Sequence, residues 1–431
     1  MIKRLKRKLS ERITRYGKLL GLDLHYFVQS GFWVGLRQGL QSLAGLVFYI
    51  VFIRLVSKEV FGNYQLILSL VAVIYILSVP GLNTAVLRSA AKGLDGDYLR
   101  AARKSFLWSL AGIPTLIAVG LYFYFYRDTA VGYALMGSSF LFPFLFLSKM
   151  RDNFLQGKRQ FKTIALANVA QTLMVNAALI IAVLLRRDSL IVIALVYFLM
   201  NVVSNLIFYK ISWKFIENKK TDPDAIKYGF FLTKLNIMGV IAANIDKVLT
   251  GIFLSAGQLA TYSVGILFTS QIQNITNSLL GVAAPKYVVQ KRLSRGKYIR
   301  IFGVSILLMV VFLFGFRFVI PILFQGKYDD SIILSIISVV FYPFFVISQL
   351  YRNQFLFTNK RVVAGEAIIY QIFKITSSVI VLPLWGITGM AFIYGFQYVV
   401  VFLSLFILGS IFKDDATKEK SIVDARSEIE T

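Results

Sequence analysis

Long apolar runs alternate with short polar connections along most of this sequence, and the pattern predicts membrane-spanning helices. A helix needs about 20 consecutive, mostly apolar residues to cross the hydrocarbon core of a bilayer. The runs of about that length lie at 31–54, 64–87, 105–125, 129–148, 163–185, 189–210, 229–253, 259–283, 301–323, 331–351, 363–384 and 387–411. We therefore expect an all-α integral membrane protein with about twelve transmembrane helices.

The distribution of positive charge predicts how these helices are oriented. If both termini and every second connection lie on one side, that side holds 36 of the 47 lysines and arginines, and the other side holds six. The positive-inside rule then places both termini in the cytoplasm. The four tryptophans fall near expected span ends, as an interfacial belt requires; they are Trp33, Trp108, Trp213 and Trp385.

Three segments lie outside the expected spans. Residues 1–28 carry eight lysines and arginines without the apolar region of a signal peptide, and they predict a basic cytoplasmic helix on the inner leaflet. Residues 213–228 are expected to form a cytoplasmic linker, and the polar residues 413–431 a disordered cytoplasmic tail. The outer connections are all short, so no separate soluble domain is expected.

Composition narrows the function further. The chain is 57% hydrophobic and only 16% charged. There is no cysteine, and the single histidine, His25, has no partner for a metal site, so we expect neither a cofactor nor a metal. Cytoplasmic loops account for most of the excess positive charge, so nucleic acid is not expected as a partner. No catalytic motif occurs, and an enzyme is not expected.

The two halves of the chain resemble each other at an offset of about 200 residues. SKEVFGNY at 57–64 matches SAGQLATY at 255–262, and GDYLR at 96–100 matches GKYIR at 296–300. NFLQGKR after the fourth span matches QFLFTNKR at an offset of 201 to 202. Six spans per half predict a parallel repeat, with an N-lobe at 29–212 and a C-lobe at 229–412 around a central cavity.

Charged residues remain inside the expected spans, and basic ones outnumber acidic ones five to two. A charge at membrane depth costs roughly 2.5–3.5 kcal/mol on insertion scales, so it usually faces a protein interior or an aqueous cavity. Arg37 shares one side of its helix with Gln38, Gln41 and Ser42, which favours a cavity, although snorkelling to the head groups also fits. An excess of positive charge in a cavity favours an anionic passenger, such as a phosphate or an acidic sugar.

We expect the cations to attract the anionic groups of a substrate and the amides to bind sugar hydroxyls. The candidate substrate-binding residues are Arg37, Gln41, Lys234, Lys247, Gln273, Asn277, Arg317 and Lys374. Arg317 also fits snorkelling, because it lies near the outer end of its span. The acidic Asp246 and Glu366 either couple transport to H⁺ or Na⁺ or pair with Lys247 or Lys374.

Two stretches resemble polysaccharide-biosynthesis flippases of the Wzx type. The first is Ser57 to Lys92, with Phe61-Gly62-x-Tyr64 and Pro80-Gly81-Leu82-Asn83-Thr84, and the second is Ala243 to Gly265. The superfamily of these flippases, the MOP superfamily, includes lipid II flippases and multidrug and toxin extrusion (MATE) transporters. The resemblance implies two six-helix lobes around a cavity that the first and seventh spans line.

The same resemblance implies a function in the bacterial cytoplasmic membrane. Alternating access would carry an undecaprenyl-pyrophosphate-linked oligosaccharide from the inner to the outer leaflet for surface polysaccharide such as O-antigen, among membrane lipids and polysaccharide assembly proteins. Two alternatives fit less well. A MATE-like exporter of organic cations should line its cavity with acidic residues, and a polysaccharide polymerase should carry a long outer loop. The glycan itself stays open.

Overall fold

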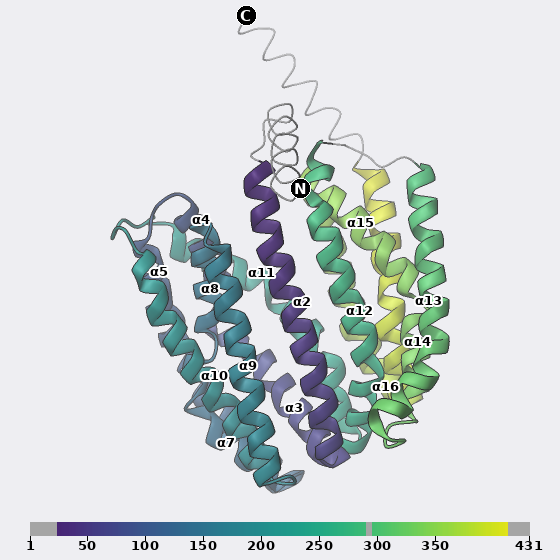
Figure 1. Cartoon of the computed structure of the whole chain (residues 1–431). Helices are drawn as coiled ribbons and strands as arrows, with labels where there is room; N and C mark the ends of the chain where they lie inside the picture. Colours follow the sequence, from purple (N-terminus) through teal and green to yellow (C-terminus); the bar gives the residue numbers. More distant parts are fainter. Residues whose placement is uncertain (1–23, 290–294, 413–431) are drawn as a thin grey trace, which may run out of the picture. The chain divides into compact units, whose positions relative to one another are not determined.

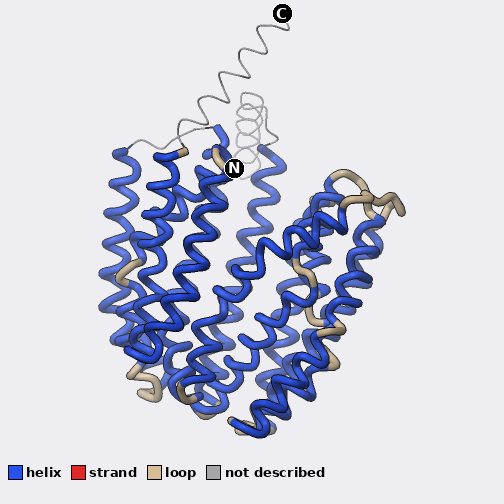
Figure 2. Tube along the Cα trace, turned by 180° about the vertical axis from the view of Figure 1, so that it is seen from behind, coloured by secondary structure: helices blue, strands red, loops and turns tan. Residues whose placement is uncertain are grey.

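The computed structural model describes residues 24–289 and 295–412, so residues 1–23 of the expected basic segment and the expected tail at 413–431 lie outside the described residues. Every regular element in the described ranges is a helix, and short loops join the helices (Figures 1 and 2). The elements are α2 (Leu24–Leu55), α3 (Lys58–Ile74), η1 (Tyr75–Ser78), α4 (Gly81–Ala91), α5 (Gly96–Ser109), α6 (Gly112–Tyr126), α7 (Thr129–Ser139), η2 (Phe142–Phe144), α8 (Leu147–Gly157), α9 (Phe161–Leu185), α10 (Leu190–Ser212), η3 (Trp213–Phe215), α11 (Ala225–Phe253), α12 (Ala256–Val289), α13 (Arg295–Phe324), α14 (Ser331–Val339), α15 (Tyr342–Thr358) and α16 (Lys360–Ile411).

By length and composition, 8 helices of the described part could cross a membrane, or up to 10 if each of two bent pairs is one span. The bent pairs are α7 with the η2–α8 segment, at 61°, and α14 with α15, at 43°. The all-α membrane fold is thus confirmed, while the exact twelve-helix layout stays a prediction. The structure gives up to 10 candidate spans instead of the twelve expected for two reasons. The polar residues of α12 keep it out of the candidate spans, and α16 contains two helices joined at a kink, which count as one.

The breaks within the helices have local causes. Val79 adopts a left-handed conformation directly before Pro80, and the expected span at 64–87 is therefore divided into α3, η1 and α4. Pro143 stands in η2 and Pro343 at the start of α15, the bends of the two broken pairs. Gly386, with φ of 54° and ψ of −143°, forms the kink inside α16.

The described chain divides into two compact units. Unit 1 comprises residues up to Val56 together with Val71–Ile237, and unit 2 comprises Ser57–Leu70 together with the residues from Met238 onward. In unit 1, α2 packs on α9, α6 on α7 and α4 on α8; in unit 2, α12 packs on α14 and α15 on α16. The helices α3 and α11 each contribute to both units. The lobes expected at 29–212 and 229–412 divide the chain once and assign no helix to both sides. These lobes stay a prediction.

The motif around Gly62 is part of the core of unit 2. A Cβ on Gly62 would lie 1.8 Å from the carbonyl oxygen of Ala256, so only glycine allows α3 to approach the start of α12 this closely. The ring of Phe61 packs edge-on against Tyr328, and Tyr64 is fully buried. The conspicuous residues of this motif therefore have a packing role.

Asp95 and Asp97 in unit 1 bind the segment 213–228, which the sequence predicts as a linker. Asp95 is completely buried, and its Oδ2 accepts hydrogen bonds from Lys158 Nζ at 3.0 Å and from the backbone N–H of Glu217 at 2.8 Å. Asp97 accepts a hydrogen bond from the backbone N–H of Asp222 at 2.9 Å. Burial lowers the pKa of Lys158, but the hydrogen bonds to Asp95 and Glu217 outweigh it and raise that pKa above its ordinary value. The linker is thus fixed to unit 1.

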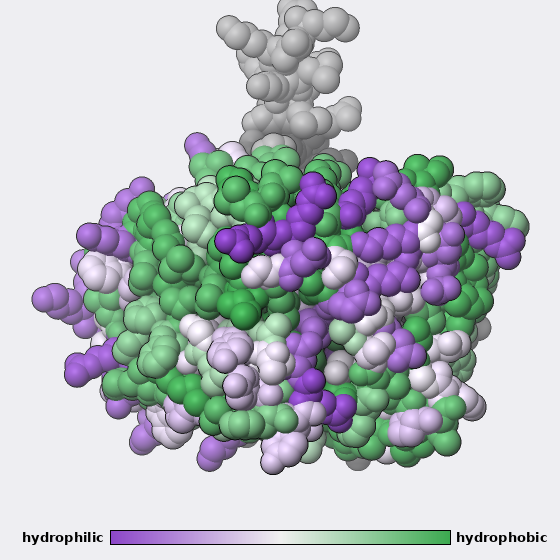
Figure 3. Space-filling view, turned by 90° about the horizontal axis from the view of Figure 1, so that it is seen from below, coloured by the Kyte–Doolittle hydropathy of each residue, from purple (hydrophilic) through white to green (hydrophobic). Residues whose placement is uncertain are grey.

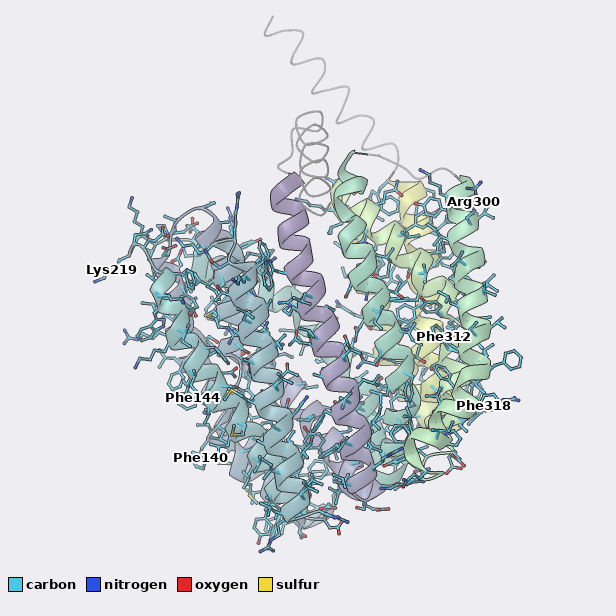
Figure 4. The ribbon with its side chains drawn as sticks, viewed as in Figure 1. Phe140, Phe144, Lys219, Arg300, Phe312 and Phe318 are labelled. Atoms are coloured by element: carbon cyan, nitrogen blue, oxygen red, sulfur yellow. The ribbon has the colours of Figure 1, made fainter. Side chains whose placement is uncertain are left out.

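Large apolar side chains cover much of the outer surface of each unit. Phe140 and Phe318 are more than 60% exposed and point away from their helices (Figure 4). Seen from below, apolar side chains (green) lie exposed beside hydrophilic ones (Figure 3). Because a soluble protein rarely exposes so much apolar surface, this surface fits contact with lipid.

Gly62→Ala is expected to lower the free energy of unfolding by about 1–3 kcal/mol, because the added methyl group meets backbone at a distance that no side-chain rotation can relieve. Thermal unfolding in detergent measures the change. Gly303→Ala on α13 is the matched control, since a Cβ there meets nothing within 4 Å. Equal melting temperatures for the two variants would contradict the packing role of Gly62.

Asp95→Ala is expected to cost about 3–5 kcal/mol, because it leaves Lys158 and the linker amides without their buried acceptor. The contribution of Lys158 is complete below its unfolded pKa of 10.5 and is lost only as the pH rises through its raised folded value. Thermal unfolding at neutral pH should therefore show the full loss. Asp188→Ala in the exposed α9–α10 loop should leave the melting temperature unchanged.

Candidate functional site

A buried ion pair joins α11 to α16 inside unit 2. Asp246 is 4% exposed, and its Oδ2 accepts a hydrogen bond from the Tyr262 hydroxyl at 2.7 Å and lies 3.3 Å from Lys374 Nζ. Its Oδ1 accepts the backbone N–H of Lys247 at 2.9 Å. Lys374 is 3% exposed, and its ammonium lies 5.4 Å from the centroid of the Tyr394 ring. Every charge in this pair is therefore compensated, which a buried ion pair needs in order to be stable.

Lys247 has a neutral partner instead of a carboxylate. Its Nζ donates a hydrogen bond to Gln65 Oε1 at 3.1 Å, and Gln65 belongs to the part of α3 that lies in unit 2. The side chain is half-buried. Gln65 therefore holds the ammonium of Lys247 in place, but Lys247 forms no ion pair with a carboxylate of the described residues.

The two predicted polar residues of α12 lie in different surroundings. Gln273 is buried, and its Oε1 accepts hydrogen bonds from Tyr394 at 3.2 Å and Tyr398 at 3.0 Å. Its amide nitrogen is buried without a hydrogen-bond partner in the described part of the chain. Asn277, one turn later, is exposed. Gln273 thus joins the Lys374 cluster through Tyr394, and Asn277 does not.

Glu366 and Arg317 lie apart from this cluster. Glu366 is 1% exposed, and its Oε2 lies 3.4 Å from Arg352 Nε, so its ion-pair partner comes from α15. Of the expected partners Lys247 and Lys374, Lys374 pairs with Asp246, whereas Glu366 pairs with Arg352, which was not expected. Arg317 on α13 is exposed.

Unit 1 contains a pocket of about 120 Å³ where α2, α8 and α9 meet. Its lining combines aromatic, apolar, amide and charged side chains: Trp33, Arg37, Asp152, Gln156, Phe161 and Ile164. Arg37 makes no hydrogen bond or ion pair with any residue of the described ranges, although its Nε is buried. A cation without a partner in a pocket is a ready site for an anionic group.

A second polar cluster lies directly beside this pocket. Arg151 is 0% exposed, and its Nε and Nη2 donate to Asp152 Oδ1 at 3.0 and 2.8 Å. Asn168 on α9 donates to Asp152 Oδ2 at 2.6 Å and also bonds Arg151. The carboxylate of Asp152 is thus neutralised by Arg151, and both of its oxygens are occupied.

The other predicted residues of unit 1 take no part in the pocket lining. Gln41 donates to Thr172 Oγ1 at 3.1 Å and links α2 to α9, which is the role of a polar contact between membrane helices. Lys234 is exposed on the part of α11 that belongs to unit 1. The structure therefore brings Asp246, Lys374 and Gln273 together, and it leaves Lys234, Asn277 and Arg317 on surfaces.

Residues 27–289, more than half of the chain, match the family described as polysaccharide biosynthesis protein. The chain belongs to this family. The resemblance read from the two sequence stretches is thereby confirmed at the level of the family. No curated protein matches the sequence.

Three solved structures have a fold similar to that of this chain. The lipid II flippase MurJ, in an inward closed conformation, matches with a TM-score of 0.65 and 14% identity over 87% of this chain and 86% of its own. An outward-facing multidrug resistance MATE family transporter of the MOP superfamily matches with a TM-score of 0.60 and 15% identity, over 91% and 96%. A MOP superfamily transporter from Pyrococcus furiosus, described as having a binding pocket of reverse polarity, matches with a TM-score of 0.59 and 14% identity over the same shares.

Sequence reasoning missed several residues of these clusters. Tyr262 ends the repeat match SAGQLATY, and its counterpart Tyr64 is likewise buried, so the repeat itself was a usable signal. Arg151 falls between the expected spans 129–148 and 163–185, yet it stands 201 residues before Arg352, close to the offset of that part of the repeat. Tyr394 and Tyr398 carry no signal that distinguishes them from other tyrosines in apolar runs.

Lys374→Met is expected to lower the free energy of unfolding by about 3–5 kcal/mol, because it leaves the carboxylate of Asp246 buried without its cation. Combining it with Asp246→Asn removes both charges and should recover most of that loss. Thermal unfolding of the two single variants and the double variant forms the test. Losses that simply add would contradict a direct pair.

Proposed function

We propose that this protein is a flippase that moves undecaprenyl-pyrophosphate-linked oligosaccharide units from the inner to the outer leaflet by alternating access. Membership of the polysaccharide biosynthesis family and a fold shared with a lipid II flippase support the class of cargo. The observation that carries the proposal is the sign of the charge that remains uncompensated inside the helices.

Both acidic residues of the expected spans are already occupied. Asp246 pairs with Lys374, and Glu366 pairs with Arg352. The cations Arg37, Lys234, Lys247 and Arg317 make no ion pair with a carboxylate within the ranges that the structure describes. Uncompensated cations at membrane depth favour an anionic cargo, and a pyrophosphate or an acidic sugar offers the charge-assisted hydrogen bonds that they lack.

The substrate-binding assignments follow from which groups are available. Arg37 and Lys234 would contact the pyrophosphate, because neither has a partner of its own. Asn277 is exposed and would bind sugar hydroxyls, whereas Gln273 and Gln41 already hold tyrosine or threonine hydroxyls and would mainly position their helices. Lys374 would act through Asp246, and Arg317 would interact with the outer head groups.

The direction of transport and its energy source belong to the same proposal. The positive-inside distribution supports a bacterial inner membrane with both termini in the cytoplasm, so the lipid-linked unit would enter from the side where it is assembled. Asp246 is the candidate for coupling to H⁺ or Na⁺, because protonation or cation binding there would release Lys374. Polysaccharide assembly proteins are the expected partners at the outer face.

The alternative function is export of organic cations, because the chain also shares its fold with a MATE family transporter. Such a protein needs a carboxylate that a cationic drug can reach. Here Asp246 and Glu366 are each less than 5% exposed and already hold a cation of the chain. The charge pattern therefore favours the flippase.

Reversing both charges with Arg37→Glu and Lys234→Glu is expected to abolish surface polymer at normal protein level, because two carboxylates would repel the pyrophosphate. Lipid extracts should then show full-length undecaprenyl-linked units accumulated in the inner leaflet. Arg186→Glu with Arg187→Glu changes the net charge equally in the exposed α9–α10 loop and should leave polymer assembly intact. Normal polymer in the first variant would refute these sites. Unchanged glycolipids in a deletion strain that is sensitive to cationic drugs would instead support the exporter.

A further inference from the structure

The net charge of the pocket around Arg37 depends on Arg151, a residue that does not line it. Asp152 is the acidic residue of the lining, and its carboxylate would cancel Arg37 if it were free. The buried Arg151 donates hydrogen bonds from Nε and Nη2 to Asp152 Oδ1, and Asn168 donates one to Oδ2. Arg151 therefore neutralises the carboxylate of Asp152, and the pocket retains the single positive charge of Arg37.

Two further features reinforce this positive character. Nη1 of the fully buried Arg151 has no hydrogen-bond partner in the part of the chain that the structure describes. Lys162, on the first turn of α9, places its ammonium 5.6 Å from the centroid of the Trp33 ring at the edge of the pocket. Two residues that contact the lining are thus basic, while both oxygens of Asp152 accept hydrogen bonds.

We propose that this pocket binds a phosphate group and that Arg151 sets its preference for an anion by neutralising Asp152. The inference rests on the proposed function only in taking the phosphate of a lipid-linked substrate as one possible source; a membrane lipid head group offers the same chemistry.

Size and lining agree with this ligand. A cavity volume of about 120 Å³ is several times the roughly 10–15 Å³ that a single water needs, so the pocket has room for a phosphate group. Arg37 presents a guanidinium fork that matches a phosphate, and Gln156 adds an amide donor. Trp33, Phe161 and Ile164 form an apolar side suited to the carbon chain of a phosphate ester.

The second half of the chain shows the same use of an arginine with a different result. Arg352 stands 201 residues after Arg151 and pairs with Glu366, which lies on the next helix. The residue after Arg352 is Asn353, so unit 2 has no counterpart of Asp152. Arg151 and Arg352 are therefore positioning residues that each neutralise a carboxylate, and in unit 1 that carboxylate borders a pocket.

The test is binding of inorganic pyrophosphate to the purified full chain in phosphatidylcholine nanodiscs, followed by isothermal titration calorimetry. Arg37→Gln should weaken binding about tenfold or more, because it removes a charge-assisted contact. Arg151→Gln should also weaken it, since Asp152 would then cancel Arg37. Asp152→Asn should tighten it, because the pocket gains a net positive charge. Arg186→Gln, at the opposite end of α9, should bind like the unmodified chain.

The opposite directions expected for Arg151→Gln and Asp152→Asn separate charge setting from a merely structural role, because damage to the fold would weaken binding in both. If Arg151→Gln does not fold, Asp152→Asn alone still decides: weaker or unchanged binding overturns the role of Arg151. Equal binding by Arg37→Gln and the unmodified chain overturns the pocket as a phosphate site.

Added phosphatidylglycerol distinguishes the two sources of phosphate. If it competes with pyrophosphate in the unmodified chain but not in Arg37→Gln, the occupant is a lipid head group; if it has no effect, the occupant is the phosphate of a substrate. Either result supports phosphate binding. Loss of pyrophosphate binding in Arg37→Gln with normal surface polymer would keep the pocket and remove it from transport, so the two proposals fail separately.

Discussion

The cost of placing an ionised side chain at membrane depth is the constraint on which most of this structure depends. Three acidic groups within the helices are each met by a cation from the chain: Asp152 by Arg151, Asp246 by Lys374, and Glu366 by Arg352. Two of these pairs join different helices, and the third is tied to α9 through Asn168. Charge compensation and helix packing are therefore the same set of contacts, and the charge that is left over is positive.

The presence or absence of an ion-pair partner separates structural cations from cations that are candidates for function. Hydropathy alone treats Arg37, Arg151, Lys234 and Lys374 as equivalent, because each is a cation in or near an apolar run. The structure distinguishes them by partner: Arg151 and Lys374 are buried in ion pairs, whereas Arg37 and Lys234 have none among the described residues. A buried pair stabilises a unit, and an unpaired cation offers its donors to a ligand. The substrate hypothesis therefore depends on Arg37 and Lys234 more than on the number of positive residues.

The helical fold and the family could be predicted from the sequence, because membrane spans and the motif at 57–92 depend on local composition. The Gly386 kink falls between the two expected spans 363–384 and 387–411 for the same reason. Ion-pair partners could not be predicted. Glu366 and Lys374 lie eight residues apart along one helix, yet each pairs with a side chain of another helix, so the partner depends on tertiary packing. Arg151 could not be predicted as a buried residue, because it follows the fourth apolar run and the helical structure continues beyond that run after the bend at η2.

The internal repeat predicted from the sequence can be compared with the contacts that each half makes. Tyr98 stacks on Phe154 with ring centroids 4.2 Å apart, and Tyr298, 200 residues later, stacks on Tyr351 at 5.1 Å. The stacked tyrosine at 98 or 298 and the arginine at 151 or 352 thus recur at matching positions, although the two tyrosines stack on residues that do not correspond. The carboxylate that meets the arginine does not recur: it lies on α8 beside a pocket in unit 1 and on α16 within the helix packing of unit 2. The matching arginines therefore meet different acidic partners in the described residues, and the carboxylate that Arg151 neutralises is the one that borders the pocket.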